Sequence, residues 1–249
     1  MSSTPLVSVI VPVYNGAAFL GEALDSLRAQ AYPALDIIVI DDGSTDDSAR
    51  IAAEAGDGVR LLSQANRGPA AARNLGLAEA RGDLIAFLDA DDLWPAGKLA
   101  AQVARLAAEP SLEVALGRVQ AFGAPGVPLP ATQPVIDVHL GSGVFRRAVF
   151  ERVGSFDVGL RFSEDHDWFL RAREQGVRLV VMQAVTLLYR VHAGNMTRQA
   201  DAGGYGLAVV LKRSLDRRRA AGTLGQRLPA LVDFDEARHH PAPTDTAHD

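Results

Sequence analysis

The chain has 249 residues, 48% hydrophobic and 22% charged, which is ordinary for a globular protein and long enough for one large α/β domain. A net charge of −5 argues against nucleic acid as the principal partner, and the absence of cysteine excludes disulfides and thiolate metal sites. The N-terminus lacks a signal-peptide pattern and no apolar run approaches the roughly 20 residues that span a bilayer. We therefore expect a cytoplasmic protein, and peripheral contact with the inner face of a membrane stays open.

Apolar segments rich in β-branched residues alternate with helical segments over about the first ninety residues. This alternation predicts a parallel sheet with helices on its faces, in which the carboxyl ends of the strands lie along one edge. Ligands bind at that edge in open sheets of this kind. The predicted strands are 6–13, 35–40, 59–62 and 84–88, and the predicted helices are 17–30, 51–55 and 70–80, the last beginning at Pro69.

The pattern changes beyond a helix that runs from Pro95 to about residue 108. A loop with four prolines and two glycines covers 123–134 and separates less regular elements. We predict strands at 114–122 and 140–145, helices at 147–153, 163–175 and 203–221, and either two strands or one kinked strand over 177–191. Ser163 is a plausible helix cap. The composition from about residue 229 onward is typical of a weakly ordered tail.

Three aspartates, Asp89, Asp91 and Asp92, directly follow the apolar strand at 84–88. Carboxylates clustered at the exit of a buried strand repel one another unless a cation or hydrogen-bond donors lie among them. Hard oxygen ligands suit Mg²⁺ or Mn²⁺, and such ions bind substrate phosphates. The alternative is a set of solvated loop acids or a helix cap. A second strand that also ends in aspartates favours the metal site over these alternatives.

That second strand end carries Asp41 and Asp42, which could accept hydrogen bonds from a nucleobase or a ribose. Capping of the next helix through 44–46 is the competing interpretation. Arg73 follows the third strand and faces the same edge, where it could offset phosphate or nucleobase charge, although a surface arginine is equally compatible. Neither GxxxxGK[ST] nor GxGxxG occurs, so the familiar phosphate loops are absent.

A second group of acids opens the helix predicted at 163–175. Glu164, Asp165 and Asp167 lie beside Trp168, and a carboxylate there could take a proton from an acceptor hydroxyl. Acids at a helix N-terminus also simply complement the helix dipole. His192 follows an apolar strand and suits a metal ligand, a phosphate contact or a structural histidine.

Five segments in order within residues 6–195 together resemble family 2 inverting glycosyltransferases of the GT-A fold. The resemblance implies a Rossmann-like, mostly parallel α/β sheet with helices on both faces and a small acceptor-side β/α portion. It also implies metal-dependent transfer of a sugar from a nucleotide-diphosphate sugar, often a UDP-sugar, to a hydroxyl of a glycan, lipid-linked or small-molecule acceptor. The segments are SVIVPVYNG, IIVIDDGSTDDS, NRGPAAARNLGLAEARGDLIAFLDADD, SEDHDWFLRA and YRVH.

The resemblance implies roles on the donor side for five residues. Pro12 and Tyr14 would line the nucleotide pocket, and Asp42 would accept a hydrogen bond from the nucleobase. Arg73 would lie near the base or the diphosphate. Asp89 would lie near the ribose.

It implies the remaining roles at the metal and the acceptor. Asp91 would ligate Mn²⁺ or Mg²⁺. His192 would match a late histidine that meets the metal or the diphosphate in the family, and we expect it at the metal. Asp165 would be the catalytic base, with Glu164 beside it in the substrate site. The acceptor would meet Asp92, which is expected to face outward, and Trp168.

The expected organisation is one domain in two halves with a C-terminal extension. Residues 1–110 would bind the nucleotide-sugar and residues 111–200 the acceptor, followed by a helix within 201–228 and a flexible tail over 229–249. A nucleotidyltransferase on a similar fold is an alternative, but VPVYNGAAFL lacks the basic residue expected to hold a triphosphate. The Glu164–Asp165 pair argues against a non-catalytic sugar-nucleotide-binding protein. The basic cluster at 212–219 suggests a membrane-bound acceptor, or only a solvated helix face.

Overall fold

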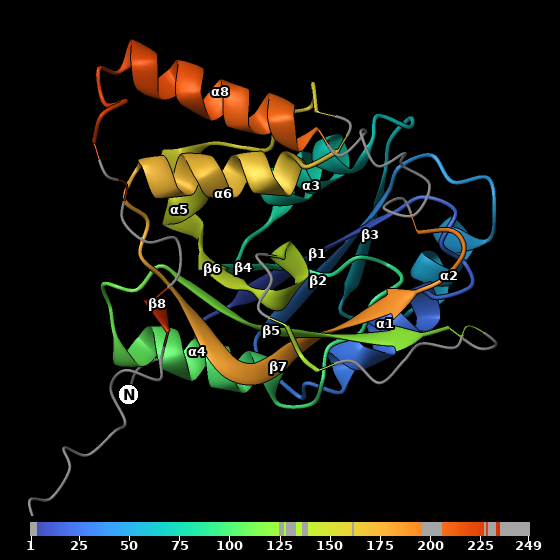
Figure 1. The fold of residues 1–249 in the computed structure, drawn as a ribbon. Coiled ribbons are helices and arrows are strands. Elements are labelled where there is room, and N and C mark those ends of the chain that lie inside the picture. Colours follow the sequence, from blue (N-terminus) through green and yellow to red (C-terminus); the bar gives the residue numbers. More distant parts are fainter. Residues whose placement is uncertain are drawn as a thin grey trace, which may run out of the picture.

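The computed structural model describes residues 4–124, 127, 133–135, 139–160, 162–195, 206–226, 228 and 233–234, and Figure 1 shows its central sheet. Within these residues the sheet has eight strands in the order β3-β2-β1-β4-β6-β5-β7-β8. The strands are β1 (Val7–Val13), β2 (Leu35–Asp41), β3 (Val59–Ser63), β4 (Leu84–Phe87), β5 (Val114–Gly123), β6 (Val144–Arg146), β7 (Leu179–Val191) and β8 (Asp233–Phe234).

The sheet is mostly parallel. β1 pairs in parallel with both β2 and β4, and β2 with β3, so that the carboxyl ends of these four strands share one edge. β6 is antiparallel to both of its neighbours, β4 and β5. Further along, β5 pairs in parallel with the long strand β7. The mostly parallel α/β fold expected from the sequence is therefore confirmed.

Helices cover both faces of the sheet. Side chains along each strand alternate between the two faces, so apolar strands present apolar side chains to a helical layer on each side. Val9 and Val11 belong to one core cluster, whereas Ile10 between them belongs to the other. The first cluster packs under α1 (Leu20–Arg28), α2 (Ser48–Glu54) and α4 (Lys98–Ala108), and the second under α3 (Pro69–Glu79), α5 (Arg147–Val153) and α6 (Glu164–Glu174).

Helix α8 (Leu207–Ala220) forms an outer layer stacked on α6, as Figure 1 shows. Arg217 on α8 donates to Asp167 at 2.9 Å and to Glu174 at 2.8 Å, both on α6. None of the helices in the described ranges is long and apolar enough to cross a membrane.

The second half differs from the sequence prediction in two places, and it decides between the two alternatives given for 177–191. The strand expected at 140–145 is a 3-10 turn, Leu140–Ser142, followed by the short strand β6. The segment forms one strand, β7 (Leu179–Val191), which was one of the two predicted alternatives, and its register with β5 shifts around Arg118. Two residues of the expected tail form β8, which pairs with β7, and the rest of that tail lies outside the described residues.

Gly82 lies two residues before the start of β4 and has no room for a side chain. A Cβ there would lie 2.5 Å from the carbonyl oxygen of Leu6 and 2.6 Å from the amide nitrogen of Ser8, both backbone atoms entering β1. We expect Gly82→Ala to lower the free energy of unfolding by about 3 kcal/mol, because β1 and β4 must separate to admit the methyl group. Urea denaturation measures the change.

Gly21 in α1 is the matched control for this substitution. Apart from its chain neighbours and the backbone of its own helix, no atom of the described residues lies within 4 Å of the position its Cβ would take, so Gly21→Ala should raise the free energy of unfolding by about 0.5–1 kcal/mol. Equal urea midpoints for Gly82→Ala and the unsubstituted protein would contradict the packing argument.

Candidate active site

The carboxyl edge of the sheet begins at the turn after β1. Pro12 is half-buried near the end of that strand, and Tyr14 just beyond it is 53% exposed. The turn is tied to the loop after β2, because the side-chain oxygen of Asn15 accepts a hydrogen bond from the amide of Thr45 at 2.8 Å. Asp46 in that loop binds the amide of Ala17 and also the first amide of α2, so the predicted capping segment joins two loops as well as starting a helix.

Asp42 follows β2 and is almost wholly buried. Its Oδ1 accepts from the side chain of Gln64 at 2.7 Å and from the amide of Arg67 at 2.9 Å. Its Oδ2 accepts from the amide of Gly68 at 2.8 Å. These bonds fix the carboxylate at the edge, while Oδ2 keeps a second lone pair for another donor.

The three aspartates after β4 lie in very different surroundings. Burial raises the pKa of Asp91, and the neighbouring Asp89 carboxylate adds to that rise. Burial also raises the pKa of Asp92 well above its ordinary range, with Asp91 and Asp89 as further causes. Asp92 is 1% exposed, and its Oδ2 has no hydrogen-bond partner among the residues that the structure describes. The turn thus carries more negative charge than its protein surroundings offset, and a cation fits that imbalance.

Arg73 on α3 connects this acidic turn to the start of α6. Its Nη2 donates to Asp89 Oδ1 at 2.7 Å, and its Nη1 donates to Glu164 Oε1. Burial disfavours the charged forms of Arg73, Asp89 and Glu164. The Arg73 guanidinium nevertheless holds the pKa of Asp89 below its ordinary value. Two acidic motifs separated by more than seventy residues in the sequence therefore meet on one buried arginine.

Asp165 lies next to Glu164 on the first turn of α6, with its side chain 22% exposed. Its Oδ1 accepts from the amide of His166 at 2.7 Å and lies 2.9 Å from the His166 ring Nδ1. Burial acts to raise the pKa of Asp165, but the hydrogen bond from the His166 ring and nearby positive charge, including that of Arg73, together outweigh it and hold the pKa below its ordinary value. Asp165 is therefore ionised at neutral pH, as a proton acceptor requires.

His192 lies beside Asp91, the other residue predicted at the metal. Its Nδ1 accepts from the amide of Gly194 at 3.1 Å, so the ring proton is on Nε2. That nitrogen is 2.9 Å from Asp91 Oδ2 and donates to it. In this arrangement His192 acts as a hydrogen-bond donor toward the acidic turn.

Arg190 is a residue of this site that the sequence interpretation missed. Its backbone amide donates to Asp92 Oδ1 at 2.8 Å, and its Nε donates to the carbonyl oxygen of Asp91 at 2.7 Å. The guanidinium lies 4.9 Å from the Phe19 ring centroid and bonds Glu22 on α1 at 2.7 Å. It belongs to the motif YRVH, in which a role was predicted only for the histidine.

His139 is the second missed residue, and it precedes the 3-10 turn. A ring nitrogen of His139 and one carboxylate oxygen from each of Asp89 and Asp92 all lie within 4.8 Å of one another, which makes a candidate acidic cation site. Its position directly before Leu-Gly-Ser-Gly, a turn rich in glycine, was the only sequence signal that could have pointed to it.

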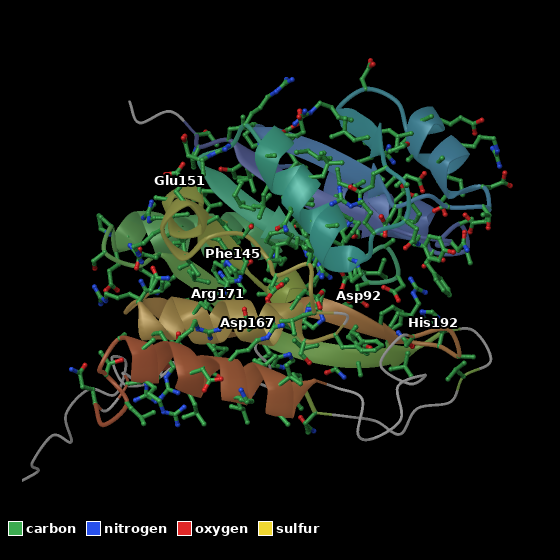
Figure 2. All side chains as sticks on the ribbon, turned by 90° about the horizontal axis from the view of Figure 1, so that it is seen from above. Asp92, Phe145, Glu151, Asp167, Arg171 and His192 are labelled. Atoms are coloured by element: carbon green, nitrogen blue, oxygen red, sulfur yellow. The ribbon has the colours of Figure 1, made fainter. Side chains whose placement is uncertain are left out.

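Two predicted acceptor contacts are contradicted by the structure. Trp168 is 0% exposed and stacks on Phe150 at 4.7 Å in the aromatic core, so it has no surface for an acceptor. Asp92 is buried and does not face outward. Figure 2 shows Asp92 and His192 in one region of the molecule, and Asp167 and Arg171 along α6. Asp167 is structural, since it accepts from Arg171 at 2.8 Å and from Arg217.

Comparison with known families and proteins places these residues in context. The model of glycosyl transferase family 2 matches residues 8–176. An uncharacterised glycosyltransferase of Rickettsia prowazekii is 29% identical over 217 residues, which cover 79% of this chain and 67% of the relative. One from Haemophilus influenzae is 46% identical over 103 residues, covering 40% of this chain and 41% of the relative. The chain thus spans between about two fifths and two thirds of these relatives.

Solved structures share the fold. Residues 1–349 of Staphylococcus aureus TarS in complex with UDP-GlcNAc align with a TM-score of 0.69 at 23% identity, over 85% of this chain and 66% of that one. The mannosyltransferase PcManGT from Pyrobaculum calidifontis, in complex with GDP-Man and Mn²⁺, aligns with a TM-score of 0.64 at 24% identity, over 92% and 67%. Both likenesses place the chain among GT-A folds.

Proposed function

The chain belongs to glycosyl transferase family 2, and from that premise we propose that it transfers a sugar from a nucleotide-diphosphate sugar to an acceptor hydroxyl with inversion. One observation carries the proposal. Arg73 bonds both Asp89, just after β4, and Glu164 at the start of α6, so the turn that carries the proposed metal ligand Asp91 and the helix start that carries the proposed base Asp165 are joined at one place.

The donor is held by the first half of the chain, residues 1–110, in this proposal. Pro12 and Tyr14 line the nucleotide, and Asp42 accepts from the nucleobase through the free lone pair of Oδ2. Arg73 and Asp89 lie toward the ribose and the diphosphate. A UDP-sugar is the favoured donor, in keeping with the UDP-GlcNAc bound by TarS, and a GDP-sugar like that bound by PcManGT is the next to test.

A divalent ion, Mn²⁺ or Mg²⁺, fits the excess negative charge of the turn, with Asp91 as the proposed ligand. When bound, such an ion neutralises charge on the departing nucleoside diphosphate. The Nε2 proton of His192 favours a hydrogen bond to a diphosphate oxygen over direct ligation, since ligation would move that proton to Nδ1, opposite the amide of Gly194. Of the two contacts expected of His192, we therefore propose the diphosphate.

The acceptor side and the base come from residues 111–200. Asp165 takes the proton of the acceptor hydroxyl, whose oxygen attacks the anomeric carbon from the face opposite the leaving nucleotide. Oδ1 is engaged by His166, which points to Oδ2 as the accepting oxygen. Glu164 neutralises Arg73 in the substrate site. A glycan, lipid-linked or small-molecule hydroxyl would serve as acceptor.

A nucleotide-sugar screen tests the function directly. Thermal unfolding is followed with Mn²⁺ and a panel that includes UDP-GlcNAc and GDP-mannose, and the best binder is then assayed for sugar transfer and hydrolysis. We expect at least one nucleotide-sugar to raise the unfolding temperature in a Mn²⁺-dependent manner. No shift with any of the panel would overturn the proposal.

Asp91→Asn tests the metal ligand. Loss of the charge should weaken binding of the nucleotide with Mn²⁺ by about tenfold to a hundredfold, measured by calorimetry, because the amide is a much poorer ligand. Binding of the nucleotide without metal should change little. Equal Mn²⁺-dependent affinities in Asp91→Asn and the unsubstituted protein would remove the assignment.

A further inference from the structure

The end of strand β7 is joined to the acidic turn after β4 through alternate residues. Leu188 and Leu93 exchange two backbone hydrogen bonds, at 2.9 and 3.0 Å. Arg190, two residues further along β7, bonds Asp91, and so does His192, two residues further again. Because a strand repeats every two residues, these three positions lie along the same side of β7. The turn is therefore fastened to a segment that is 99 residues away from Asp91 at Arg190.

Arg190 holds the acidic turn by two separate bonds. Its backbone amide donates to Asp92 Oδ1 at 2.8 Å, and its side-chain Nε donates to the carbonyl oxygen of Asp91 at 2.7 Å. The second bond holds the main chain of the residue whose carboxylate is the proposed metal ligand. Where that main chain lies determines the direction of the carboxylate, so the bond from Nε acts on the ligand while Arg190 itself makes no contact with an ion.

The guanidinium of Arg190 is itself held firmly. Its Cζ lies 4.9 Å from the centroid of the Phe19 ring and 4.7 Å from that of the Phe122 ring. Its Nη2 donates to Glu22 on α1 at 2.7 Å, and the Arg190 side chain is 3% exposed. A planar guanidinium that is already fixed by such contacts loses little freedom when it also donates to a carbonyl oxygen. This rigidity suits Arg190 to orient another residue.

We propose that Arg190 is a positioning residue of the metal site, which fixes the main chain at Asp91 through its Nε–H and so aims the Asp91 carboxylate. The assignment rests on the proposed metal-dependent transfer, with Asp91 as the ligand. Groups that orient a metal ligand without binding the ion typically change metal affinity by about 10- to 100-fold when they are removed. Arg190 acts on the affinity for Mn²⁺ in the same way.

Three substitutions separate the Nε–H from the charge of Arg190. Arg190→Gln places an amide nitrogen where Nε lies, so that an N–H still donates to the carbonyl oxygen of Asp91, but the charge is lost. Arg190→Met has almost the same size and places a methyl group there. Arg190→Lys keeps the charge and places a methylene group at the Nε position. A difference between Gln and Met therefore measures the Nε–H bond, because both lose the charge and the bond to Glu22.

Calorimetry of Mn²⁺ binding to the protein saturated with UDP measures the effect. Arg190→Met and Arg190→Lys should each weaken Mn²⁺ about tenfold, whereas Arg190→Gln should stay within about threefold of the unsubstituted protein. Glu22→Gln is the matched control, since it removes only the outer partner of the guanidinium, a side chain that is 62% exposed, and it should change the affinity by less than about twofold. The affinity for UDP without metal should stay within about twofold in every variant, because the bond acts on the metal ligand.

Three results would overturn this role for Arg190. An unchanged affinity for Mn²⁺ in Arg190→Met would remove it, and equal losses in Gln and Met would assign the effect to charge or ring contacts. An equal loss of UDP affinity without metal would mean a general distortion of the site. Failure of the unsubstituted protein to bind Mn²⁺ with UDP, or any nucleotide-sugar, would instead overturn the proposed function. Thermal unfolding establishes that each variant is folded, and if Arg190→Met is not, the comparison of Lys with Gln decides.

Discussion

Asp165→Asn is expected to lower the rate of sugar transfer by roughly 10²- to 10⁴-fold, the range that a positioned general base contributes. The amide has the shape of the carboxylate and can keep the hydrogen bond from the amide of His166. It cannot take a proton from an acceptor hydroxyl. Affinity for the nucleotide with Mn²⁺ should stay within about twofold, because the effect falls on the chemical step.

Steady-state transfer assays and calorimetry on the same preparation measure these two quantities. Asp167→Asn is the matched control, since it removes a carboxylate from the same turn of α6. Asp167 is 2% exposed and bonds Arg171 and Arg217, so its substitution should lower the unfolding temperature and leave the rate nearly unchanged. Near-normal turnover by Asp165→Asn would mean that another group is the base.

Arg73→Met should have the largest effect on stability. The substitution leaves the carboxylates of Asp89 and Glu164 without their shared guanidinium, and Arg73 is 7% exposed. Removing one member of a buried ionic group costs about 3–5 kcal/mol, because the remaining charge stays buried and unpaired. Urea denaturation at pH 7 measures the loss, and transfer should fail as well.

The same variant should show a characteristic dependence on pH. Arg73 holds the pKa of Asp89 below its ordinary value. Their pairing therefore stabilises the protein fully at pH values above the ordinary pKa of Asp89, and this stabilisation is lost as the pH falls through the lowered pKa. The difference between Arg73→Met and the unsubstituted protein should therefore shrink in acid.

Adding Glu164→Gln should restore part of the stability that Arg73→Met loses, since one of the two unpaired charges disappears. Arg73→Lys should recover little, because a single ammonium cannot reproduce the two directed bonds of the guanidinium. A double variant no more stable than Arg73→Met would contradict the electrostatic explanation.

Local patterns predicted the first half of the fold well. Strands β1 to β4 and the helices between them follow from apolar runs and punctuating turns, and Pro69 does begin α3. The second half was harder to predict because the short strand β6 has only three residues and pairs antiparallel between two parallel neighbours. So short a segment carries too little periodicity to separate a strand from a turn.

The same limit applies to single residues. Trp168 and Asp92 were expected at the acceptor, yet both side chains are buried, because spacing along a helix or turn does not say which neighbour covers a side chain. His139 and Arg190 were missed for the converse reason. Each lies far along the chain from the acids it approaches, and no local pattern records that contact.

The sequence by itself determined the parallel sheet, the acidic end of β4 and the resemblance to glycosyl transferase family 2, because periodicity and short motifs are local properties. Only the tertiary structure decided how the acids divide. Arg73 joins Asp89 to Glu164, Asp167 turns away to hold α8, and Asp165 is left beside His166 at the site. Those assignments depend on contacts between distant segments, which form only when packing of the two helical layers fixes where each chain segment lies.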